Sequence, residues 1–199
     1  MRQVVAAALV LAGLVVLPHP ARASGAAKAL EKPVKTLITA VRYGKDSLGI
    51  KQLAGEAQAR FLLGEAYEKA TEAQRAEFIR LFHQLFAGIA FPKIRQNFEH
   101  LETILYEPPE IEGDTAKMKS TLVILHPLKK QEIRVEYTLK KVGKRWKVFD
   151  VLVLGTGGDS MLTSIRNDQV QPILAEGGMD HLLKLMRERA AEIEKAKQG

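Results

Sequence analysis

The side chains that could bind a metal or carry catalysis are few and scattered along the chain. The histidines are His19, His83, His100, His126 and His181. No two of them have the i, i+4 spacing that places two imidazoles on one helix face for a metal ion. Cysteine is absent, which excludes thiolate metal sites, cysteine nucleophiles and a disulfide framework. We therefore expect no metal and no cofactor.

One short block offers a serine nucleophile. Gly158-Asp159-Ser160-Met161 resembles the Gly-Asp-Ser block of a lipase family, in which the block lies near the mature N-terminus and an Asp-x-x-His pair follows far downstream. Here the block lies late, and the last histidine directly follows Asp180. A simpler interpretation is that Asp159 or Ser160 caps the next helix by accepting a hydrogen bond from a free backbone N–H. We expect no enzymatic activity, and a serine-reactive probe would test the hydrolase alternative.

The glycine-rich stretch 155–158 precedes the same helix. It matches neither the dinucleotide-binding fingerprint nor a phosphate-binding loop with its lysine. It is most simply a flexible connection between a strand and a helix, and a gate at the mouth of a cavity is the functional alternative.

The N-terminus has the pattern of a secretory signal peptide. Arg2 precedes the uncharged, apolar segment Val4–Leu17, and Ala21-Arg22-Ala23 has the A-x-A form of a cleavage site. The apolar segment is shorter than the ~20 residues that a spanning helix needs. We expect residues 1–23 to be removed near Ala23, and residues 24–199 to form one exported, soluble domain.

The charge of the chain favours acidic partners. The formal net charge is +7, and removal of Arg2 and Arg22 with the signal peptide leaves +5. A mild basic excess suits phospholipid headgroups or an acidic protein surface, although ordinary solubilising charge explains it equally well. Export argues against nucleic acid as a partner.

Residues 30–100 have helical periodicity. Thr71-Glu72-Ala73-Gln74 is a capping-box signature for a helix that begins there. Apolar residues then recur on one face of this helix, and His83 lies off that face, which predicts an exposed or partly buried imidazole. Pro92 is expected to end or kink the helix.

The period changes to two after Pro108-Pro109. Residues 132–140 alternate between polar and apolar, which predicts a strand with one wet face. Residues 141–144 suit a hairpin turn, and residues 145–154 form a strand that we expect to be central because both of its faces are apolar. Residues 116–125 and 103–106 give two further strands.

Two helices are expected to close the chain, over residues 161–174 and 179–196. The order of helices, then strands, then helices predicts a single α+β domain. Periodicity indicates which faces are buried. It does not distinguish a filled core from a cavity.

Three passages between about Leu53 and Ala191 resemble the MlaC family, also called the toluene-tolerance family. The helix Ala70–Phe82 is similar to the family's A-T-x-A-Q-R-x-x-F-x-x-L-F, and Ile133–Leu139 with Trp146–Val151 is similar to its Y-x-L … W-K-V-Y-D-V hairpin. Gly177–Leu183 matches a glycine and a leucine pair that open the family's last helix. The first two passages together are fairly specific.

One segment departs from the family pattern G-V-S-L-V-x-x-Y-R-x-Q-F. The arginine is present as Arg166, whereas Ile165 replaces the tyrosine and Val170 replaces the last aromatic residue. Because related proteins handle hopanoids, this departure leaves a polycyclic lipid as an alternative cargo.

The resemblance implies helices packed on one face of a twisted, mainly antiparallel sheet of about four strands, with an apolar cavity between them. It implies a periplasmic carrier that shuttles phospholipid between an inner-membrane ABC-transporter complex and an outer-membrane lipid-transfer complex, touching membranes only transiently. On this basis the predicted cavity wall consists of Phe82, Leu85, Phe86, Ile89, Val135, Tyr137, Leu139, Val148, Phe149, Val151 and Val153, closed at one end by Leu162, Ile165, Ile173 and Leu174.

Two other functions fit the same sequence. The first is a carrier of a hopanoid, a quinone or a hydrophobic peptide. The second is an interaction protein whose core is filled and which carries no lipid.

Overall fold

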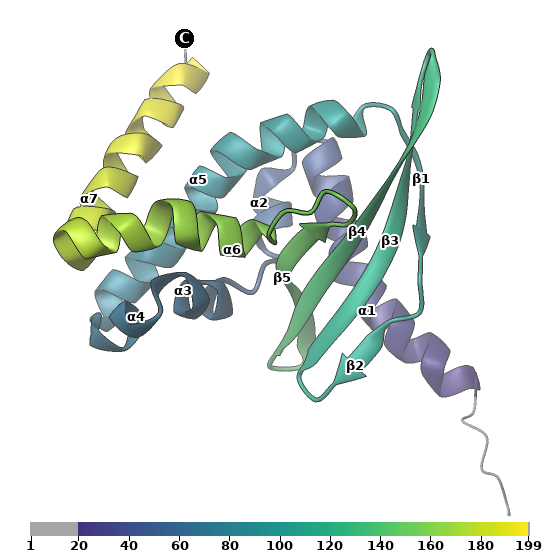
Figure 1. The fold of residues 1–199 in the computed structure, drawn as a ribbon, viewed down its shortest axis with the longest axis horizontal. Helices are drawn as coiled ribbons and strands as arrows, with labels where there is room; N and C mark the ends of the chain where they lie inside the picture. The colour runs from purple at the N-terminus through teal and green to yellow at the C-terminus, as the bar shows by residue number, and fades with distance from the viewer. Residues whose placement is uncertain (1–19, 199) are drawn as a thin grey trace, which may run out of the picture.

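A computed structural model describes residues 20–198 of the chain, and the side chains of residues 25–197. The predicted signal peptide therefore lies almost entirely outside the described residues; the backbone of residues 20–23 forms the start of the first helix. The elements, in chain order (Figure 1), are α1 (Pro20–Arg42), α2 (Asp46–Ile50), α3 (Gly55–Leu63), α4 (Glu65–Lys69), α5 (Glu72–Phe98), β1 (Leu101–Tyr106), β2 (Glu110–Glu112), β3 (Thr115–His126), β4 (Lys129–Val142), β5 (Arg145–Val153), α6 (Met161–Ile165), a π-helical turn (Arg166–Val170) and α7 (Gln171–Gln198).

The strands form one antiparallel sheet in the order β1-β3-β4-β5, with the short β2 paired to β3. The α+β class predicted from the sequence is confirmed, with five strands where about four were expected. The two-residue turn Gly143-Lys144 joins β4 to β5, and Gly143 has a φ of 58° there, a conformation that glycine adopts at no steric cost.

The prediction that the strand after this turn is central is wrong, because β5 lies at the end of the sheet. Its outer edge is covered by the segment before α3. The N–H of Ala54 donates to the Val148 carbonyl at 2.9 Å, and the N–H of Val148 donates to the Gln52 carbonyl at 2.8 Å. The second apolar face of β5 packs on helices instead of on another sheet.

A β-bulge in β5 explains why this second face of the strand packs on the helices. Thr138 pairs with Asp150 and Leu139 pairs with Val148, so Phe149 is the extra residue. Its ring meets the ring of Phe61 from α3 edge-to-face, with 5.8 Å between the centroids. The bulge therefore turns one large side chain of the sheet onto the helices.

Helix α5 begins as the sequence predicts. The N–H of Gln74 donates to the Thr71 hydroxyl at 3.2 Å, and the N–H of Thr71 donates to the Gln74 side chain at 2.9 Å, which completes the capping box. The helix does not end at Pro92; it continues to Phe98. The ring of Phe91, just before the proline, is fully buried, and burial of this face outweighs the hydrogen bond that proline removes.

The C-terminal helices are joined more closely than expected. The predicted helix over residues 161–174 is α6, the π-helical turn and the start of α7, in one continuous run. The expected break before residue 179 is present at Gly178, whose φ of 69° and ψ of −165° are not helical. This glycine redirects the second half of α7 back along α5.

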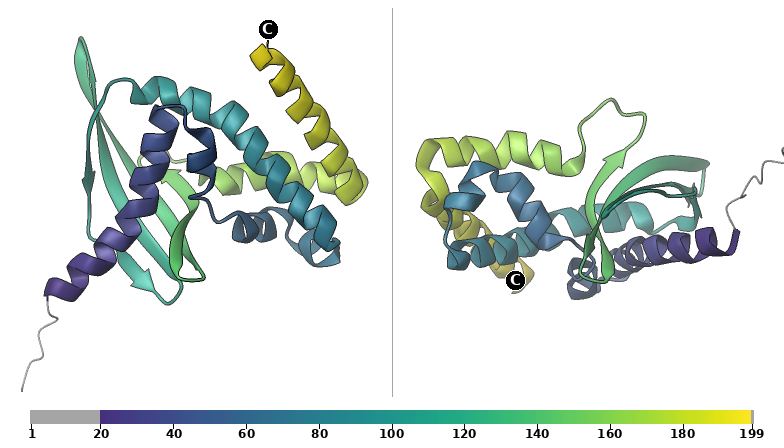
Figure 2. Two further views of the ribbon diagram at one scale, coloured as in Figure 1. Left: turned by 180° about the vertical axis from the view of Figure 1, so that it is seen from behind. Right: turned by 90° about the horizontal axis from the view of Figure 1, so that it is seen from below.

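The helices are arranged in two groups around the sheet (Figure 2). Helix α1 runs along one face of the sheet, and its Leu30, Val34, Ile38 and Val41 face the strands with helical spacing. This group, with the last turns of α5, makes one hydrophobic core. Helices α3 to α7 gather beside the sheet around a second core that includes Phe78, which is fully buried.

Candidate functional site

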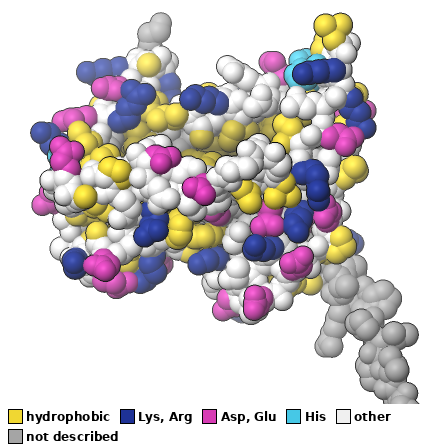
Figure 3. Space-filling view, viewed as in Figure 1, with side chains coloured by type: hydrophobic (Ala, Val, Ile, Leu, Met, Phe, Trp, Pro, Cys, Tyr) yellow, Lys and Arg dark blue, Asp and Glu magenta, His cyan; other side chains and the backbone are white. Residues whose placement is uncertain are grey.

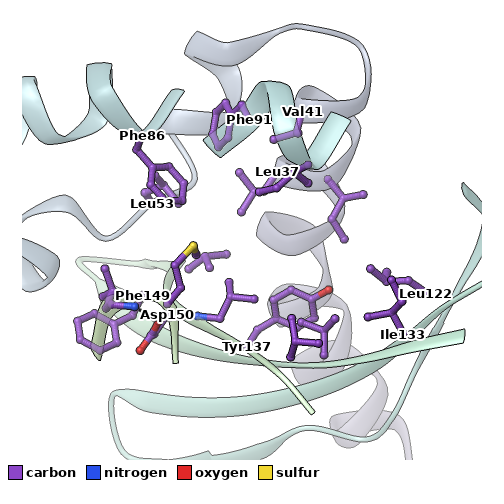
Figure 4. A pocket seen from close by; sticks show the side chains of 18 of the residues that line it. Leu37, Val41, Leu53, Phe86, Phe91, Leu122, Ile133, Tyr137, Phe149 and Asp150 are labelled. Carbon is purple, nitrogen blue, oxygen red and sulfur yellow. Dashed lines mark hydrogen bonds between the residues drawn. The ribbon is translucent and has the colours of Figure 1, made fainter. Parts of the chain in front are cut away.

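A cavity of about 520 Å³ lies between the sheet and helices α1 and α5 (Figure 4). We call it cavity A. Its lining is mostly apolar, with a few polar residues. The residues that line it are Leu37, Ile38, Val41, Leu53, Gln58, Phe86, Phe91, Ile94, Asn97, Phe98, Leu122, Ile133, Val135, Tyr137, Val148, Phe149, Asp150, Val151, Val153, Thr156, Asp159, Met161 and Leu162.

The alternation of side chains along the strands determines which sheet residues line cavity A. Val135 and Tyr137 alternate on β4, and the pairing sets them opposite Val153 and Val151 of β5. Because successive side chains of a strand point to opposite faces, these four side chains share the inner face. Two residues of the alternating strand β4 and two residues of β5 therefore meet at one wall.

A second cavity, cavity B, has a volume of about 450 Å³ and lies among the helices. Helix α5 lies on one side of it, and the run from α6 to α7 lies on the other. Its lining consists of Phe78, Phe82, Leu85, Phe86, Ile89, Ala90, Met161, Ile165, Gln169, Val170, Ile173, Leu182, Leu185, Met186 and Arg189. Figure 3 shows a hollow lined by hydrophobic side chains between α5 and α6 on this face of the molecule.

Phe86 and Met161 line both cavities. The ring of Phe86 lies 5.8 Å from the ring of Phe82, which lines cavity B, and 5.4 Å from the ring of Phe91, which lines cavity A. Phe86 also packs against both hydrophobic cores. These two side chains form the partition between the cavities.

Asp150 fixes the start of α6 at the rim of cavity A. Its Oδ1 accepts from the N–H of Leu162 at 2.9 Å and from the N–H of Val151 at 2.8 Å. The side chain is buried, with 8% of it exposed. A carboxylate with two backbone donors is satisfied within the protein, so its role here is to hold α6 against β5.

Two other polar residues that line cavity A, Gln58 and Tyr137, are also paired within the protein. The Gln58 side chain donates to the Phe149 carbonyl at 2.8 Å and so holds the bulge. The Tyr137 hydroxyl lies 3.1 Å from the Ser120 hydroxyl, and burial raises the pKa of Tyr137 to about 12. The phenol therefore stays neutral in the cavity wall at physiological pH. These groups support the wall and do not converge on a common point.

None of the histidines among the described residues belongs to a group that is placed to hold a metal ion. His83 is partly buried, as predicted, and lies 3.4 Å from the Gln58 side-chain oxygen. Burial lowers the pKa of His83 to about 4, so it is neutral at pH 7. His100 and His126 lie side by side, with 5.0 Å between ring centroids. Among the described residues, no group of three or more His, Asp or Glu side chains is placed to hold a metal ion.

Ser160 is the N-cap of α6, which confirms the capping interpretation. Its hydroxyl accepts from the N–H of Thr163 at 3.4 Å and donates to the Thr163 hydroxyl at 2.8 Å. The serine is therefore engaged with the helix that it begins.

The structure divides the predicted wall between the two cavities. All but two of the predicted residues line a cavity, and they are distributed over two cavities where one wall was predicted. The sheet residues Val135, Tyr137, Val148, Phe149, Val151 and Val153 line cavity A together with Leu162, whereas Phe82, Leu85, Ile89, Ile165 and Ile173 line cavity B, and Phe86 lines both.

Leu139 and Leu174 line neither cavity. Leu139 lies beyond the bulge and is fully buried in the core, where side chains surround it on all sides. Leu174 packs against the helical core. The ring of Phe149 points away from the centre of cavity A (Figure 4), although the residue belongs to the lining.

The main omission from the sequence-based wall is α1. Leu37, Ile38 and Val41 close cavity A against the sheet. Phe91, directly before the expected break at Pro92, and Ile94 and Phe98 beyond it extend the wall along α5. The i, i+3, i+4 spacing of apolar residues within residues 34–41 indicated that this face of α1 is buried. Leu182, Leu185 and Met186 of α7 were likewise missed in cavity B.

None of the helices among residues 20–198 is both long enough and apolar enough to cross a bilayer. Together, the fold and the two cavities define the class of the molecule: an α+β fold in which helices and a sheet leave a largely apolar interior open to the surface.

Comparison with known proteins identifies the family. The sequence model of the MlaC protein family matches residues 52–188, and the chain therefore belongs to the MlaC family. A solved structure of a phospholipid-binding protein from Ralstonia solanacearum, in complex with a phospholipid, superposes with a TM-score of 0.67 at 16% identity, covering 85% of this chain and 98% of that chain. This likeness shows a shared fold. No significant match is found among curated proteins.

Proposed function

We propose that the protein is a periplasmic lipid carrier that buries the acyl tails of a phospholipid in its cavities and leaves the headgroup outside. The observation that carries the proposal is cavity A: about 520 Å³ of mainly apolar space, in which the polar groups of Gln58, Tyr137 and Asp150 are paired within the protein. Membership of the MlaC family and the phospholipid in the Ralstonia solanacearum structure support the cargo class.

The energy of transfer explains why such a carrier is needed. Two tails of sixteen carbons hold about 30 methylene and methyl groups, and at ~0.8 kcal/mol per group their exposure to water costs on the order of 20 kcal/mol. An apolar cavity offsets this cost during transit through water. Specificity then depends on tail volume more than on headgroup hydrogen bonds.

The proposal includes export and a transport route. Residues 1–23 are a signal peptide that is removed near Ala23, and the mature domain moves lipid between an inner-membrane ABC-type transporter and an outer-membrane complex. The net charge of the mature chain, +5, suits brief contact with acidic headgroups or an acidic partner. N-terminal sequencing of the protein recovered from a periplasmic fraction should begin at Ser24; retention of Met1 would contradict the export step.

The direct test is native mass spectrometry of the purified mature protein, followed by solvent extraction and lipid identification. A stoichiometric diacyl phospholipid is the expected result. Detection of a hopanoid or a quinone instead would support a carrier function with a different cargo. A ligand-free mass that does not change after incubation with phosphatidylglycerol vesicles would refute the carrier function and favour an interaction protein.

Overpacking of cavity A gives a matched pair of variants. Val151→Trp places an indole in cavity A, and Leu128→Trp places the same indole at a side chain that is 98% exposed on the β3–β4 turn. We expect Val151→Trp to lose most of its bound phospholipid while Leu128→Trp retains it. Equal lipid content in the two folded variants would show that cavity A does not hold the tails.

A further inference from the structure

The sheet has one closed edge and one open edge. At β5, the backbone of residues 52–54 pairs with the strand and closes that edge. At the other side of the sheet, Figure 1 shows β1 as the outermost strand, and among the described strands it pairs with β3 alone. An open strand edge presents unpaired N–H and C=O groups, which can hydrogen-bond to a strand of another chain. The edge of β1 is therefore a surface to which a partner can add a strand.

The pairing of β1 with β3 determines which of its backbone groups are free. The N–H of Glu107, directly after β1, donates to the Lys119 carbonyl at 2.9 Å, and Leu105 lies two residues earlier in the same register. In an antiparallel pair, alternate residues direct both of their backbone groups to the neighbouring strand. The N–H and C=O groups of Ile104 and Tyr106 therefore point to the open edge.

The open edge is regular and partly apolar. Lysine, proline and bulges are the features that usually block the addition of a strand. Strand β1 contains neither lysine nor proline, and its bulge is confined to its first residues. Ile104 and Tyr106 pack against the core, whereas Leu105, which lies between them, is 57% exposed on the other face of the sheet. A partner strand therefore meets an unblocked edge with an apolar side chain beside it.

A groove beside this edge provides space for side chains of an added strand. It has a volume of about 550 Å³ and lies between the first turns of α1 and the segment that joins β1 to β2. Ala27, Tyr106, Pro109 and Ile111 make much of its lining apolar, and the buried Tyr106 hydroxyl has no hydrogen-bond partner among the described residues. Every second side chain of an added strand would point to this side of the sheet.

The open edge is acidic in a protein that is basic overall. Residues 96–116 contain six carboxylates and no lysine or arginine, although the net charge of the chain is +7. Two of these carboxylates pair with basic residues of β4. Glu102, Glu110 and Glu112 are exposed, and none of them forms an ion pair with another described residue. Electrostatic complementarity therefore favours a partner segment that carries lysine or arginine.

The same charge disfavours a second copy of this chain as the partner. Two β1 strands paired edge to edge would bring the carboxylates of both copies together. Like charges on paired strands destabilise a sheet. A basic segment of another protein would be attracted where a second copy would be repelled.

We propose that the open edge of β1 binds an extended, basic segment of a partner protein, which adds to the sheet as a further strand. Its backbone pairs with Ile104 and Tyr106, its apolar side chains face the groove, and its lysine or arginine side chains lie near Glu102 and Glu110. This surface is separate from cavities A and B, because no residue of β1 or β2 lines either cavity. Binding here therefore leaves the apolar interior open.

The first test uses a short synthetic peptide in which lysine and valine alternate. The mature protein is titrated into the labelled peptide, and binding is followed by fluorescence anisotropy. We expect saturable binding of one peptide per protein, which weakens as salt is added because exposed charges are screened. Two further peptides carry N-methyl groups on all lysine amides or on all valine amides. Only one of these two sets faces β1 in a paired strand, so one methylated peptide should lose about tenfold in affinity and the other should not.

A matched pair of variants locates the peptide on the protein. Leu105→Lys adds a positive charge beside the open edge, and Leu48→Lys adds the same charge to a side chain of α2 that is 41% exposed and lies outside the sheet. Thermal unfolding confirms that both variants are folded. Leu105→Lys should weaken binding of the unmodified peptide about tenfold, and Leu48→Lys should leave it unchanged.

Hydrogen exchange of the wild type tests the site without a substitution. The bound peptide should slow exchange of the Ile104 and Tyr106 amides, which face the open edge. The amide of Leu105 is already paired with β3, and its exchange should not change.

Four results would overturn the inference. Equal affinities of the two methylated peptides would exclude strand pairing and leave a purely electrostatic contact. Equal effects of Leu105→Lys and Leu48→Lys would place the peptide elsewhere on the protein. Absence of binding at millimolar peptide would show that the edge accepts no basic strand. A wild-type dimer in sedimentation equilibrium that Leu105→Lys converts to a monomer would identify a second copy of the chain as the occupant.

Discussion

At Gly88, helix α5 packs so close to Ile193 of α7 that an added side chain would clash. A Cβ atom built on Gly88 would lie 2.7 Å from Cγ2 and 3.3 Å from Cδ1 of Ile193. Cγ2 is attached to the branched Cβ of a helical isoleucine, whose χ1 angle is restricted. We therefore predict that Gly88→Ala destabilises the protein, although alanine favours a helix over glycine.

The magnitude follows from two opposed effects. Replacement of glycine by alanine inside a helix gains roughly 1 kcal/mol of helix propensity. Overpacking of a close contact costs about 1–3 kcal/mol. Because the clash involves a stiff side chain, we expect a net loss of about 1 kcal/mol, which lowers the melting temperature by roughly 2–4 °C in a domain of this size.

A double-mutant cycle isolates the clash. In the Ile193→Ala background only the Cβ of residue 193 remains, at 3.8 Å from the new methyl group, which is ordinary contact. There Gly88→Ala should stabilise by roughly 1 kcal/mol, so that the sign of its effect reverses and the coupling is about 2 kcal/mol. The assay is urea unfolding of all four proteins.

A Gly88→Ala variant that is not destabilised would contradict this prediction. If Gly88→Ala alone is as stable as wild type, or more stable, the two helices do not pack as closely as described. The same result would weaken the description of cavity B, because α5 and α7 form its walls.

Three further predictions concern buried polar groups. Because burial lowers the pKa of His83 to about 4, from about 6.5 in an unfolded chain, the unfolded state binds more protons than the folded state between these pH values. The free energy of unfolding of the wild type should therefore fall by up to ~3 kcal/mol as the pH drops from 6.5 to 4, and that of His83→Gln should fall less. Parallel pH dependences of the two proteins in urea unfolding would contradict this. Asp150→Ala leaves two backbone N–H groups without their acceptor, including that of Leu162, and should cost about 1–3 kcal/mol by urea unfolding, whereas Asp150→Asn should cost less; equal losses would exclude the acceptor role. Tyr137→Phe removes the partner of the Ser120 hydroxyl, which is 1% exposed, and should cost about 1 kcal/mol in thermal unfolding, recovered in part by adding Ser120→Ala.

Most helices and strands could be predicted from the sequence because the interactions that define them join residues that are close in the chain. The capping box at Thr71 involves residues three apart, and the alternation in β4 reflects which face of one strand is wet. Strand order is different. Nothing within residues 145–153 indicates that Leu53, almost a hundred residues earlier, covers the edge of β5, so its two apolar faces were mistaken for those of a central strand.

The kinds of residue that line the interior could be predicted from the sequence, but the division of the lining between two cavities could not. Hydrophobic periodicity identifies side chains that leave water, and Val135, Tyr137 and Ile89, which it indicated, each line one of the cavities. Whether two buried side chains touch or face a void depends on the distance between elements, which no single segment encodes. Phe86 and Met161, which line both cavities, are distant in the chain, and only the fold places them in the same linings.

The bridge between Leu53 and Val148 has a consequence for the order of folding. The segment Gln52–Ala54 pairs with β5, which lies near the far end of the sequence, so this pairing needs a finished β4–β5 hairpin and the closure of a long loop. We expect the meander β3-β4-β5, whose contacts are local, to form first, and α1 to α3 to dock afterwards. Pulse-labelled hydrogen exchange should then show the amides of Val135 and Tyr137 protected before that of Ala54. Until that last step the apolar face of α1 has no strand to cover it, and this interval is when the chain is most exposed to aggregation.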